Sequence, residues 1–404
     1  MTMTLAEKRK ILMGMSDKIN AKEGRAVIGF ASNPEIANKL AITRIPFPSL
    51  ALNEITGGGL PVGKISIVSG NEDSGKTSVV LETIGKAMKE DPDFVALWLE
   101  SESSISNEQL EMFGIDPDRF IYLELEEKGA AEIAVDRMTS YLKTGTLNLI
   151  CINSIKCLTP SAEFEKDMDS ATIGLQARFM SKLMRKVTAI VSEHKVAFVM
   201  TNHLTTNIGV MHGDPLTQAC GRAVRYASML TLDFRKKSVL DADPVPNKED
   251  YMKIGVTVRK NHCTVTSNPY KKCDYFVEYG KGTDTSGEII DAAITNGYIV
   301  KAGAWIREYD ETTGDVRVLP NGTEAKWNGM KAFKTFLDEN EEYFLYLKDK
   351  VEGKIKVEDM TEEEVQEIIK SENKNEEFIS NLEEVMVEQD KKKTAKSKKK
   401  EAAK

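Results

Sequence analysis

The sequence has few cysteines, no long apolar run and no excess of positive charge. Its five cysteines among 404 residues stand singly, without C-x-x-C spacing, so we expect no metal cluster. No apolar stretch is long enough to cross a bilayer and no secretory leader is recognisable, which predicts a cytoplasmic protein with no membrane partner. The net charge of −8 argues against a protein that coats nucleic acid through an overall basic surface. Any nucleic-acid contact must come from local loops.

The clearest motif is glycine-rich and spans residues 70–77, where G-N-E-D-S-G-K-T fits the phosphate-loop pattern G-x-x-x-x-G-K-[ST]. A β-branched run at 64–69 predicts a strand before it, and apolar residues at helical spacing predict a helix over 78–89. An ordinary glycine turn is the alternative, but strand, loop and helix in this order favour nucleotide binding.

The expected chemistry is the binding of ATP and Mg²⁺. Glycines let backbone N–H groups turn toward a polyphosphate at the positive end of a helix. Lys76 would reach the β- and γ-phosphates, and the Thr77 hydroxyl would hold the metal. The residues expected to contact the nucleotide are Gly70, Asn71, Glu72, Asp73, Ser74, Gly75, Lys76, Thr77 and Ser78.

Strand-like and helical segments alternate after this loop, which predicts an α/β fold with a mostly parallel central sheet flanked by helices. Its ligand crevice should lie at the carboxyl ends of the strands. The expected strands are 94–99, 147–152 and 196–200, and the expected helices are 107–113, 130–142 and 174–194. Runs at 253–260 and 274–279 alternate as antiparallel edge strands do.

The chain divides into four expected parts. Residues 1–42 contain a charged amphipathic helix over 5–20, either an oligomerisation arm for a neighbouring subunit or a segment packed on its own domain. Residues 43–283 form the core, and 284–355 form a small C-terminal α/β domain. Residues 356–404 comprise an acidic segment and a lysine-rich tail, whose composition predicts disorder.

Polar residues at three expected strand ends are candidates for catalysis. Glu100 and Glu102 follow a buried strand, where a carboxylate facing the nucleotide can orient a water for attack on the γ-phosphorus. A solvated loop is the alternative for either one. His203 ends another strand and could report whether the γ-phosphate is present, although a histidine satisfied by local packing is also open.

Asn153 stands where the second nucleotide motif usually has Asp. The amide oxygen can still hold a magnesium-bound water, but the lost charge weakens attraction to the metal by roughly 1 kcal/mol or more. We therefore expect slow hydrolysis, and Asn153→Asp is expected to raise it.

The segment 204–223 is a candidate polymer-binding loop, because it holds Gly209, Gly213, Pro215 and Gly221 and lacks periodicity. The segment 166–174 is a second candidate. Mobile surface loops are the alternative. Basic residues near these segments suit the phosphates of a single strand; they are Arg178, Arg185, Lys186, Arg222 and Arg225.

Together these segments resemble the RecA recombinase family. The resemblance runs from about residue 45 to 310 and is carried, in the family's order, by 58–65, the phosphate loop, 158–163, 174–181, 208–215 and 301–305. It implies a RecA-like P-loop ATPase core and a DNA recombinase that builds homo-oligomeric helical filaments on single-stranded DNA with ATP and pairs it with duplex DNA. Loader or mediator proteins are a further class of partner that the resemblance leaves open.

The resemblance also implies residue roles. Glu102 corresponds to the catalytic glutamate, acting with Lys76, and His203 to the nucleotide sensor, which is Gln in bacterial members. Segments 166–174 and 204–225 correspond to the DNA-binding loops, where Ile173 and Ile208 would wedge between bases. The implied DNA-binding residues are Ile173, Gly174, Arg178, Ile208, Gly209, Gly213, Arg222 and Arg225.

Two further positions correspond to lysines that reach the neighbouring subunit's ATP. Lys260 is kept, but the second position is His262, which is largely neutral at pH 7. The acidic segment, the lysine-rich tail and His203 resemble bacteriophage members of the family. Two alternatives stay open: a filament-forming single-stranded DNA-binding protein with weak or no hydrolysis, and a ring-forming ATPase, which the absence of a separate helicase domain disfavours.

Overall fold

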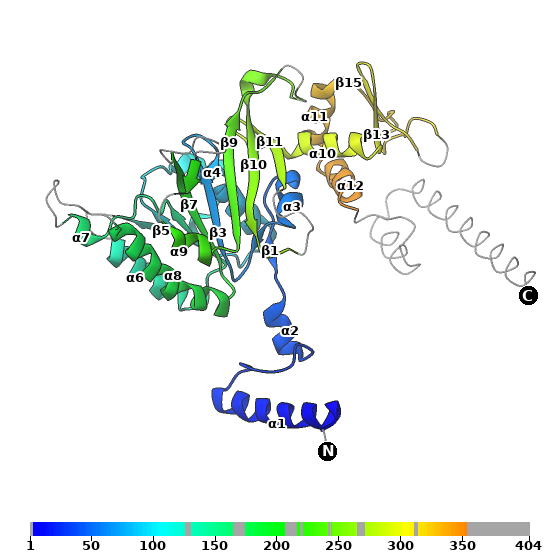
Figure 1. The fold of residues 1–404 in the computed structure, drawn as a ribbon. Coiled ribbons are helices and arrows are strands. Elements are labelled where there is room, and N and C mark those ends of the chain that lie inside the picture. The colour runs from blue at the N-terminus through cyan, green and yellow to red at the C-terminus, as the bar shows by residue number, and fades with distance from the viewer. Residues whose placement is uncertain are drawn as a thin grey trace, which may run out of the picture. The chain divides into compact units, whose positions relative to one another are not determined.

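The computed structural model describes residues 3–125, 131–164, 174–206, 216–218, 221–240, 243, 245–264, 271–310 and 314–353 (Figure 1). The chain forms two compact units. The first contains Met1–Asp243 and Asn247–Glu288, and the second contains Pro244–Pro246 and Ile289–Lys404. Among the described residues, no helix combines the length and the apolar character needed to span a membrane.

The first unit is built on a ten-stranded sheet in which the order along the main path is β12-β11-β10-β9-β3-β7-β6-β4-β5, with β8 paired to β7. Strands β9, β3, β7, β6, β4 and β5 run parallel, which confirms the predicted mostly parallel α/β core. The strand bounds are β3 Ile65–Gly70, β4 Ala96–Glu100, β5 Phe120–Glu124, β6 Leu149–Asn153, β7 Ala197–Thr206, β8 Leu216–Gln218, β9 Leu230–Lys237, β10 Tyr251–Asn261, β11 Lys272–Glu278 and β12 Gly282–Thr283.

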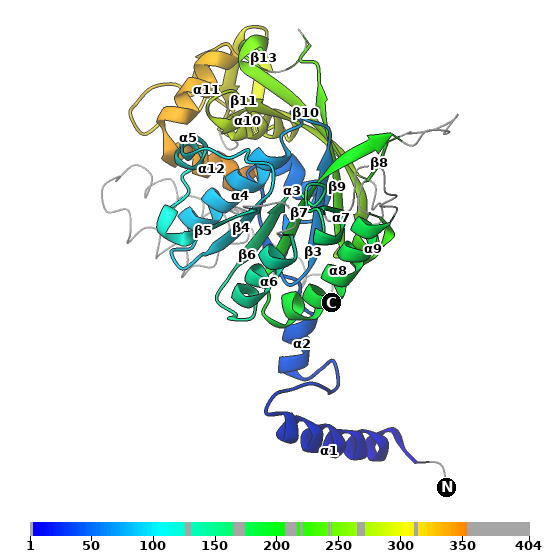
Figure 2. The same ribbon diagram turned by 90° about the vertical axis from the view of Figure 1, so that its left-hand side faces the viewer.

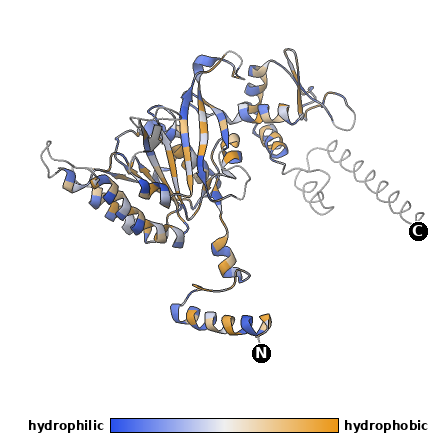
Figure 3. Ribbon diagram, viewed as in Figure 1, coloured by the Kyte–Doolittle hydropathy of each residue, from blue (hydrophilic) through white to orange (hydrophobic). Residues whose placement is uncertain are grey.

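Helices cover both faces of this sheet (Figure 2). One apolar cluster joins the sheet to α4 through Val80, Leu81 and Ile84, and a second joins it to α6 and α8 through residues such as Met138 and Met184. The helices alternate between hydrophilic and hydrophobic residues (Figure 3), as expected for helices half buried on a sheet. Their bounds are α3 Leu50–Thr56, α4 Lys76–Glu90, α5 Asn107–Met112, α6 Ala131–Leu142, α7 Ser161–Phe164, α8 Leu175–Glu193 and α9 Arg222–Ala227; a 3₁₀ turn spans Pro117–Arg119.

The N-terminal segment holds α1 (Leu5–Glu23) and α2 (Pro34–Leu40), followed by the two-stranded pair β1 (Arg44–Ile45) and β2 (Leu60–Pro61). A capping box between Thr4 and Glu7 begins α1, and Gly24 in the left-handed region ends it. No residue of α1 is buried. The apolar stripe of α1 is therefore exposed, and the use of this helix as an oligomerisation arm stays a prediction.

The second unit packs a small antiparallel sheet with helices. The sheet has the order β13-β14-β15, with bounds Ile299–Ala302, Trp305–Glu308 and Lys326–Asn328. Helices α11 (Met330–Glu339) and α12 (Glu341–Val351) complete it, and α10 (Thr285–Thr295) begins in the first unit. Its aromatic core centres on Trp327, whose ring centroid lies 4.2 Å from that of Phe333. Most of the predicted C-terminal part thus has its own core.

Three details differ from the sequence-based expectation. Strand β10 is interior, because β9 and β11 flank it, so it is not an edge strand. Strands β5 and β9 were not predicted, since each mixes polar with apolar residues. The described residues of the segment 204–223 are not all irregular: β7 continues to Thr206 and pairs with β8.

Candidate functional site

The glycine-rich loop joins β3 to α4 and leaves no room for side chains at its two glycines. A Cβ on Gly70 would lie 2.3 Å from Ser74 Oγ and 2.6 Å from the Phe234 carbonyl oxygen. Gly75 has φ +81°, and a Cβ there would lie 2.5 Å from Ile254 Cδ1. Because Gly75 is the N-cap of α4 and has no side chain, the first-turn N–H groups carry no side-chain cap. The loop is therefore a backbone cradle suited to an anion.

Lys76 places a cation inside this cradle. Its side chain is 7% exposed, and Nζ donates to the Asn71 carbonyl oxygen at 2.6 Å. Burial lowers the pKa of Lys76, although the negative charges of Glu102, Glu72 and Asp73 oppose that shift. The cradle thus combines backbone donors with a cation held by the loop itself.

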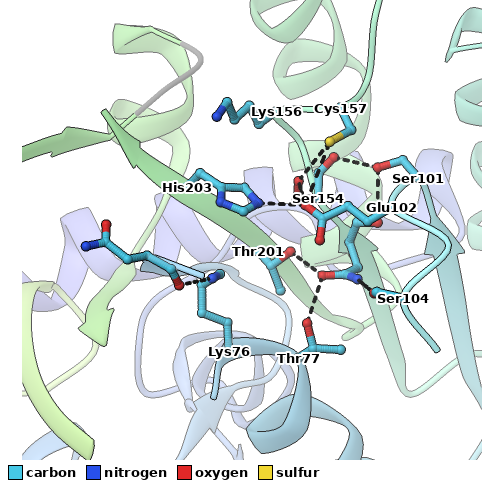
Figure 4. A network of polar contacts seen from close by, with 12 residues as sticks. Lys76, Thr77, Ser101, Glu102, Ser104, Ser154, Lys156, Cys157, Thr201 and His203 are labelled. Atoms are coloured by element: carbon cyan, nitrogen blue, oxygen red, sulfur yellow. Dashed lines mark hydrogen bonds and ion pairs between the residues drawn. The ribbon is translucent and has the colours of Figure 1, made fainter. Parts of the chain in front are cut away.

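Strand register brings the predicted catalytic residues to one edge of the sheet. Gly70 lies opposite His203 on β7, and Glu100 on β4 lies opposite Asn153 on β6. Strands β3, β4 and β6 end at Gly70, Glu100 and Asn153, whereas β7 continues to Thr206. Figure 4 shows the side chains of Thr77, Glu102 and His203 at this edge of the sheet. Thr77 Oγ1 donates to Asn153 Oδ1 at 3.3 Å, which unites the two predicted metal ligands.

Glu102 is the centre of the polar network drawn in Figure 4. His203 Nε2 lies 2.7 Å from Glu102 Oε1, and the Ser154 hydroxyl donates to the same oxygen. Burial raises the pKa of Glu102, but the hydrogen bonds from Ser154 and His203 and the charge of Lys76 outweigh it, so the pKa lies below its ordinary value. Glu102 is therefore anionic at neutral pH and suited to act as a base.

Glu100 does not face the loop as predicted. Its side chain is fully buried, and it accepts hydrogen bonds from Trp98 Nε1 at 2.9 Å and from the Glu102 backbone N–H at 2.6 Å. The expectation that both glutamates point toward the nucleotide is wrong for Glu100, because its side chain turns to the buried indole and amide beside it. Asn153 Nδ2 also donates to it, at 3.1 Å.

Two residues of this edge were missed from the sequence. Thr201 Oγ1 donates to Asn153 Oδ1 at 2.6 Å, and Ser154 contacts Glu102 as described above. Thr201 lies two residues before His203 on the same strand, and Ser154 directly follows Asn153. A parallel register between the predicted strands was the signal that would have found both.

Lys260 and His262 lie away from this edge. The His262 backbone N–H donates to Met229, which donates in turn to Ile65 at the amino end of β3. Ile65 lies at the opposite end of β3 from Gly70, about 16 Å away by the rise of a strand. Neither side chain belongs to the phosphate loop's surroundings within one chain.

Lys260 instead caps the end of α9. Its Nζ donates to the Arg225 carbonyl oxygen at 2.9 Å and to the Ser228 carbonyl oxygen. A cation is favourable at the carbonyl end of a helix. The contact therefore fixes α9 against β10.

The described DNA-binding candidates gather on two neighbouring helices. Gly174 is the N-cap of α8, Arg178 lies in its first turn, and Arg222 and Arg225 lie on α9; all four are exposed. A Cβ on Gly221, just before α9, would lie 3.2 Å from the Ala177 Cβ, so the two helices approach closely. The remaining candidates, Ile173, Ile208, Gly209 and Gly213, lie outside the described residues, as does nearly all of 166–174.

Comparison with known proteins gives one consistent result. The family model described as the RecA N-terminal domain matches residues 14–284. The chain is 30% identical over 305 residues to "Protein RecA" of Ruegeria pomeroyi, covering 75% of this chain and 81% of that protein. It is 30% identical over 331 residues to that of Streptomyces rimosus (81% and 82%) and 31% identical over 312 residues to that of Cutibacterium acnes (76% and 85%).

Proposed function

The chain belongs to the RecA family, and from that membership we propose that it is an ATP-dependent DNA recombinase that forms helical filaments on single-stranded DNA and catalyses homologous pairing and strand exchange in recombination and repair. The observation that carries the proposal is the convergence of the phosphate loop, Glu102 and His203 at one sheet edge. A cytoplasmic location, associated with the nucleoid when DNA is bound, and interaction with loader proteins belong to the same proposal.

The residues at this edge fit ATP and Mg²⁺. Both loop glycines sit where any Cβ would clash, and Gly75 supplies no side-chain cap to the first turn of α4, whose N–H groups therefore suit a polyphosphate. Thr77 Oγ1 and Asn153 Oδ1 lie 3.3 Å apart and supply neutral oxygens of the kind magnesium accepts, directly or through water. When bound, the metal would neutralise charge on the phosphates.

In the proposed mechanism Glu102 is the general base that orients the attacking water, since its carboxylate is anionic at neutral pH and able to accept a hydrogen bond from water. Ser154 and His203 hold its Oε1 oxygen and so fix the direction of the other oxygen. Lys76 would bind the β- and γ-phosphates.

His203 is the proposed sensor because it touches the catalytic carboxylate and lies on β7. The strand continues from His203 to Thr206 and pairs there with β8. A movement of the Glu102 side chain can thus be transmitted through His203 and along β7 to the segment that follows this strand. The proposal assigns that segment, with Arg178, Arg222 and Arg225, to single-stranded DNA.

As a RecA-family member the chain is an ATPase, and we propose that its turnover is slow. Asn153 contributes an amide where a carboxylate is usual, and His262 replaces a lysine. Lys260 and His262 would act on the ATP of a neighbouring protomer, since they lie at the far end of β3 from the loop of their own chain. A head-to-tail contact of this kind does not close on itself and builds a helix. Residues 1–42 are the proposed arm for this contact.

The test compares the wild type with Lys76→Ala in binding to a labelled single-stranded oligonucleotide, with ATP, with a non-hydrolysable analogue and with no nucleotide. We expect Lys76→Ala to lose nucleotide-dependent binding by about 10²-fold or more, because the charge-assisted phosphate contact is removed. Lys89→Ala, at the exposed end of the same helix, is the matched control. Equal coating of DNA with and without nucleotide by the wild type would refute the proposal.

A further inference from the structure

The last residues of β4 and β6 form a buried pair of unequal charge. Glu100 is fully buried and Asn153 is 1% exposed. Asn153 Nδ2 lies 3.1 Å from Glu100 Oε2 and 3.3 Å from Glu100 Oε1. The two residues are register partners on neighbouring parallel strands, so the contact is imposed by the sheet and does not depend on a flexible loop.

Asn153 Nδ2 also lies 3.0 Å from Ser104 Oγ. A hydroxyl can either donate or accept, so it is the contact with Glu100 that determines which end of the Asn153 amide faces the phosphate loop. An ionised carboxylate only accepts hydrogen bonds, whereas an amide has one accepting and one donating end. The donating end must therefore face Glu100. The accepting end is left to face the Thr201 hydroxyl at 2.6 Å and the Thr77 hydroxyl at 3.3 Å. If the amide turned over, its oxygen would lie against the carboxylate oxygens of Glu100.

The charge of Glu100 is held by neutral donors. The groups that donate to it among the described residues are the Trp98 indole, the Glu102 backbone N–H and the Asn153 amide, and none is a cation. A carboxylate at position 153 would replace the donating amide by a second acceptor at about the same separation. Two acceptor-only groups would then meet where water does not reach.

We propose that Glu100 is a positioning residue of the nucleotide site, which orients the Asn153 amide so that its oxygen faces Thr77, and that the 100/153 pair is built to hold a single negative charge. The effect on hydrolysis rests on the proposed function, but the pairing itself is a property of the nucleotide-free chain. The geometry reverses the simple expectation that an acid at position 153 alone speeds hydrolysis: the acid is tolerated only if the charge at position 100 is removed.

The experiment compares Glu100→Gln, Asn153→Asp and the double variant Glu100→Gln/Asn153→Asp with the wild type. Glu124→Gln is the matched control, since Glu124 is the register partner of Glu100 on the other side of β4 and is exposed. Two readouts are taken: the melting temperature without nucleotide in a metal chelator, and kcat, KM and the half-saturating Mg²⁺ concentration for ATP hydrolysis with single-stranded DNA.

We expect Asn153→Asp to lower the melting temperature by about 5 °C and kcat by about tenfold. Glu100→Gln should also lose activity, because both oxygens of Glu100 accept from Asn153 Nδ2 and an amide at position 100 would turn a second donor toward that nitrogen. The double variant should recover the melting temperature and most of kcat, since the amide introduced at position 100 can donate to the carboxylate introduced at position 153. The half-saturating Mg²⁺ concentration of the double variant should fall. This non-additivity is the signature of the pair.

Two results would overturn the proposal. One is an Asn153→Asp variant that melts as the wild type does and hydrolyses ATP as fast or faster. The other is a double variant whose losses equal the sum of the single ones. Because melting is measured without nucleotide, it decides the question of the pair even if the wild type hydrolyses no ATP, a result that would count against the proposed function alone.

Discussion

Two buried carboxylates, one in each compact unit, are stabilised in opposite ways. Glu100 in the first unit has neutral partners, as described above. Glu308 in the second unit is 1% exposed and contacts cations: Arg317 Nη1 at 3.0 Å and Lys350 Nζ at 3.9 Å. The hydroxyls of Tyr343 and Tyr346 also donate to Glu308, at 2.6 Å and 2.9 Å.

The comparison distinguishes a carboxylate that stabilises the fold, Glu308, from one that lies at the nucleotide site, Glu100. Burial lowers the pKa of Arg317, but the charge of Glu308 outweighs it and raises the pKa above its ordinary value. Burial and the same carboxylate raise the pKa of Tyr343. Glu308 is thus neutralised within its own unit. Glu100 has no cationic partner among the contacts of the described residues, and its neutral donors lie at the sheet edge that carries the phosphate loop.

The largest effect is expected when the buried ion pair between Glu308 and Arg317 is broken. Arg317→Met leaves Glu308 buried with fewer compensating partners, and should cost the second unit about 3–5 kcal/mol of stability. Hydrogen exchange of α11 and α12, compared with that of β3 and β4, measures it. Adding Glu308→Gln to Arg317→Met should recover part of the loss by removing the uncompensated charge. Unchanged exchange of α11 and α12 in Arg317→Met would show that the pair does not stabilise this unit.

At the nucleotide site, removal of a charge should change chemistry more than stability. Glu102→Gln should lower DNA-stimulated kcat by about 10²-fold, because an amide cannot take a proton from water. Binding of a fluorescent ATP analogue and the melting temperature should change little, since the amide can still accept from Ser154. Glu124→Gln controls for the loss of a carboxylate from this sheet. A kcat within about threefold of the wild type would remove Glu102 from the catalytic role.

Another carboxylate, that of the partly buried Glu288, accepts hydrogen bonds from donors at the start of α3: Ser49 Oγ at 2.6 Å and the Leu50 N–H at 2.7 Å. Burial raises the pKa of Glu288 to about 7, against the opposing effect of these hydrogen bonds. A raised folded-state pKa contributes stability that is fully present below the unfolded pKa and is lost as pH rises through 7. Between pH 5 and pH 8 the loss should be about 2 kcal/mol.

Urea unfolding of the first unit at several pH values tests this, with Glu288→Gln as the comparison. The variant cannot ionise, so its free energy of unfolding should fall less over the same pH range. Parallel curves for wild type and variant would mean that Glu288 does not titrate in this range.

The smallest effect is expected at the sensor position. His203→Gln should change kcat by less than about tenfold, because a glutamine amide can donate to Glu102 as the imidazole does and no net charge is required. His203→Ala, which removes the donor, should reduce the stimulation by DNA more than His203→Gln does. Equal losses in the two variants would show that the hydrogen bond at 2.7 Å is not what His203 contributes.

The predictable part of the site was local in sequence. The phosphate loop is eight consecutive residues, and its flanking strand and helix follow from short-range periodicity. Asn153 and His203 were found because each ends an apolar run. The partner of Glu100 is 53 residues away, and its identification requires the register of β4 and β6, which no local pattern encodes. For the same reason Thr201 was missed and β10 was placed at an edge.

The position of Lys260 and His262 at the far end of β3 has a numerical consequence for the proposed assembly. If each ATP is completed by the next protomer along, then a row of protomers contains one complete pocket fewer than its number of members, and an isolated molecule contains none. Short rows lose a large share of their pockets to this end effect, whereas long rows lose almost nothing. Turnover per protomer should therefore rise with the length of the DNA offered and then level off.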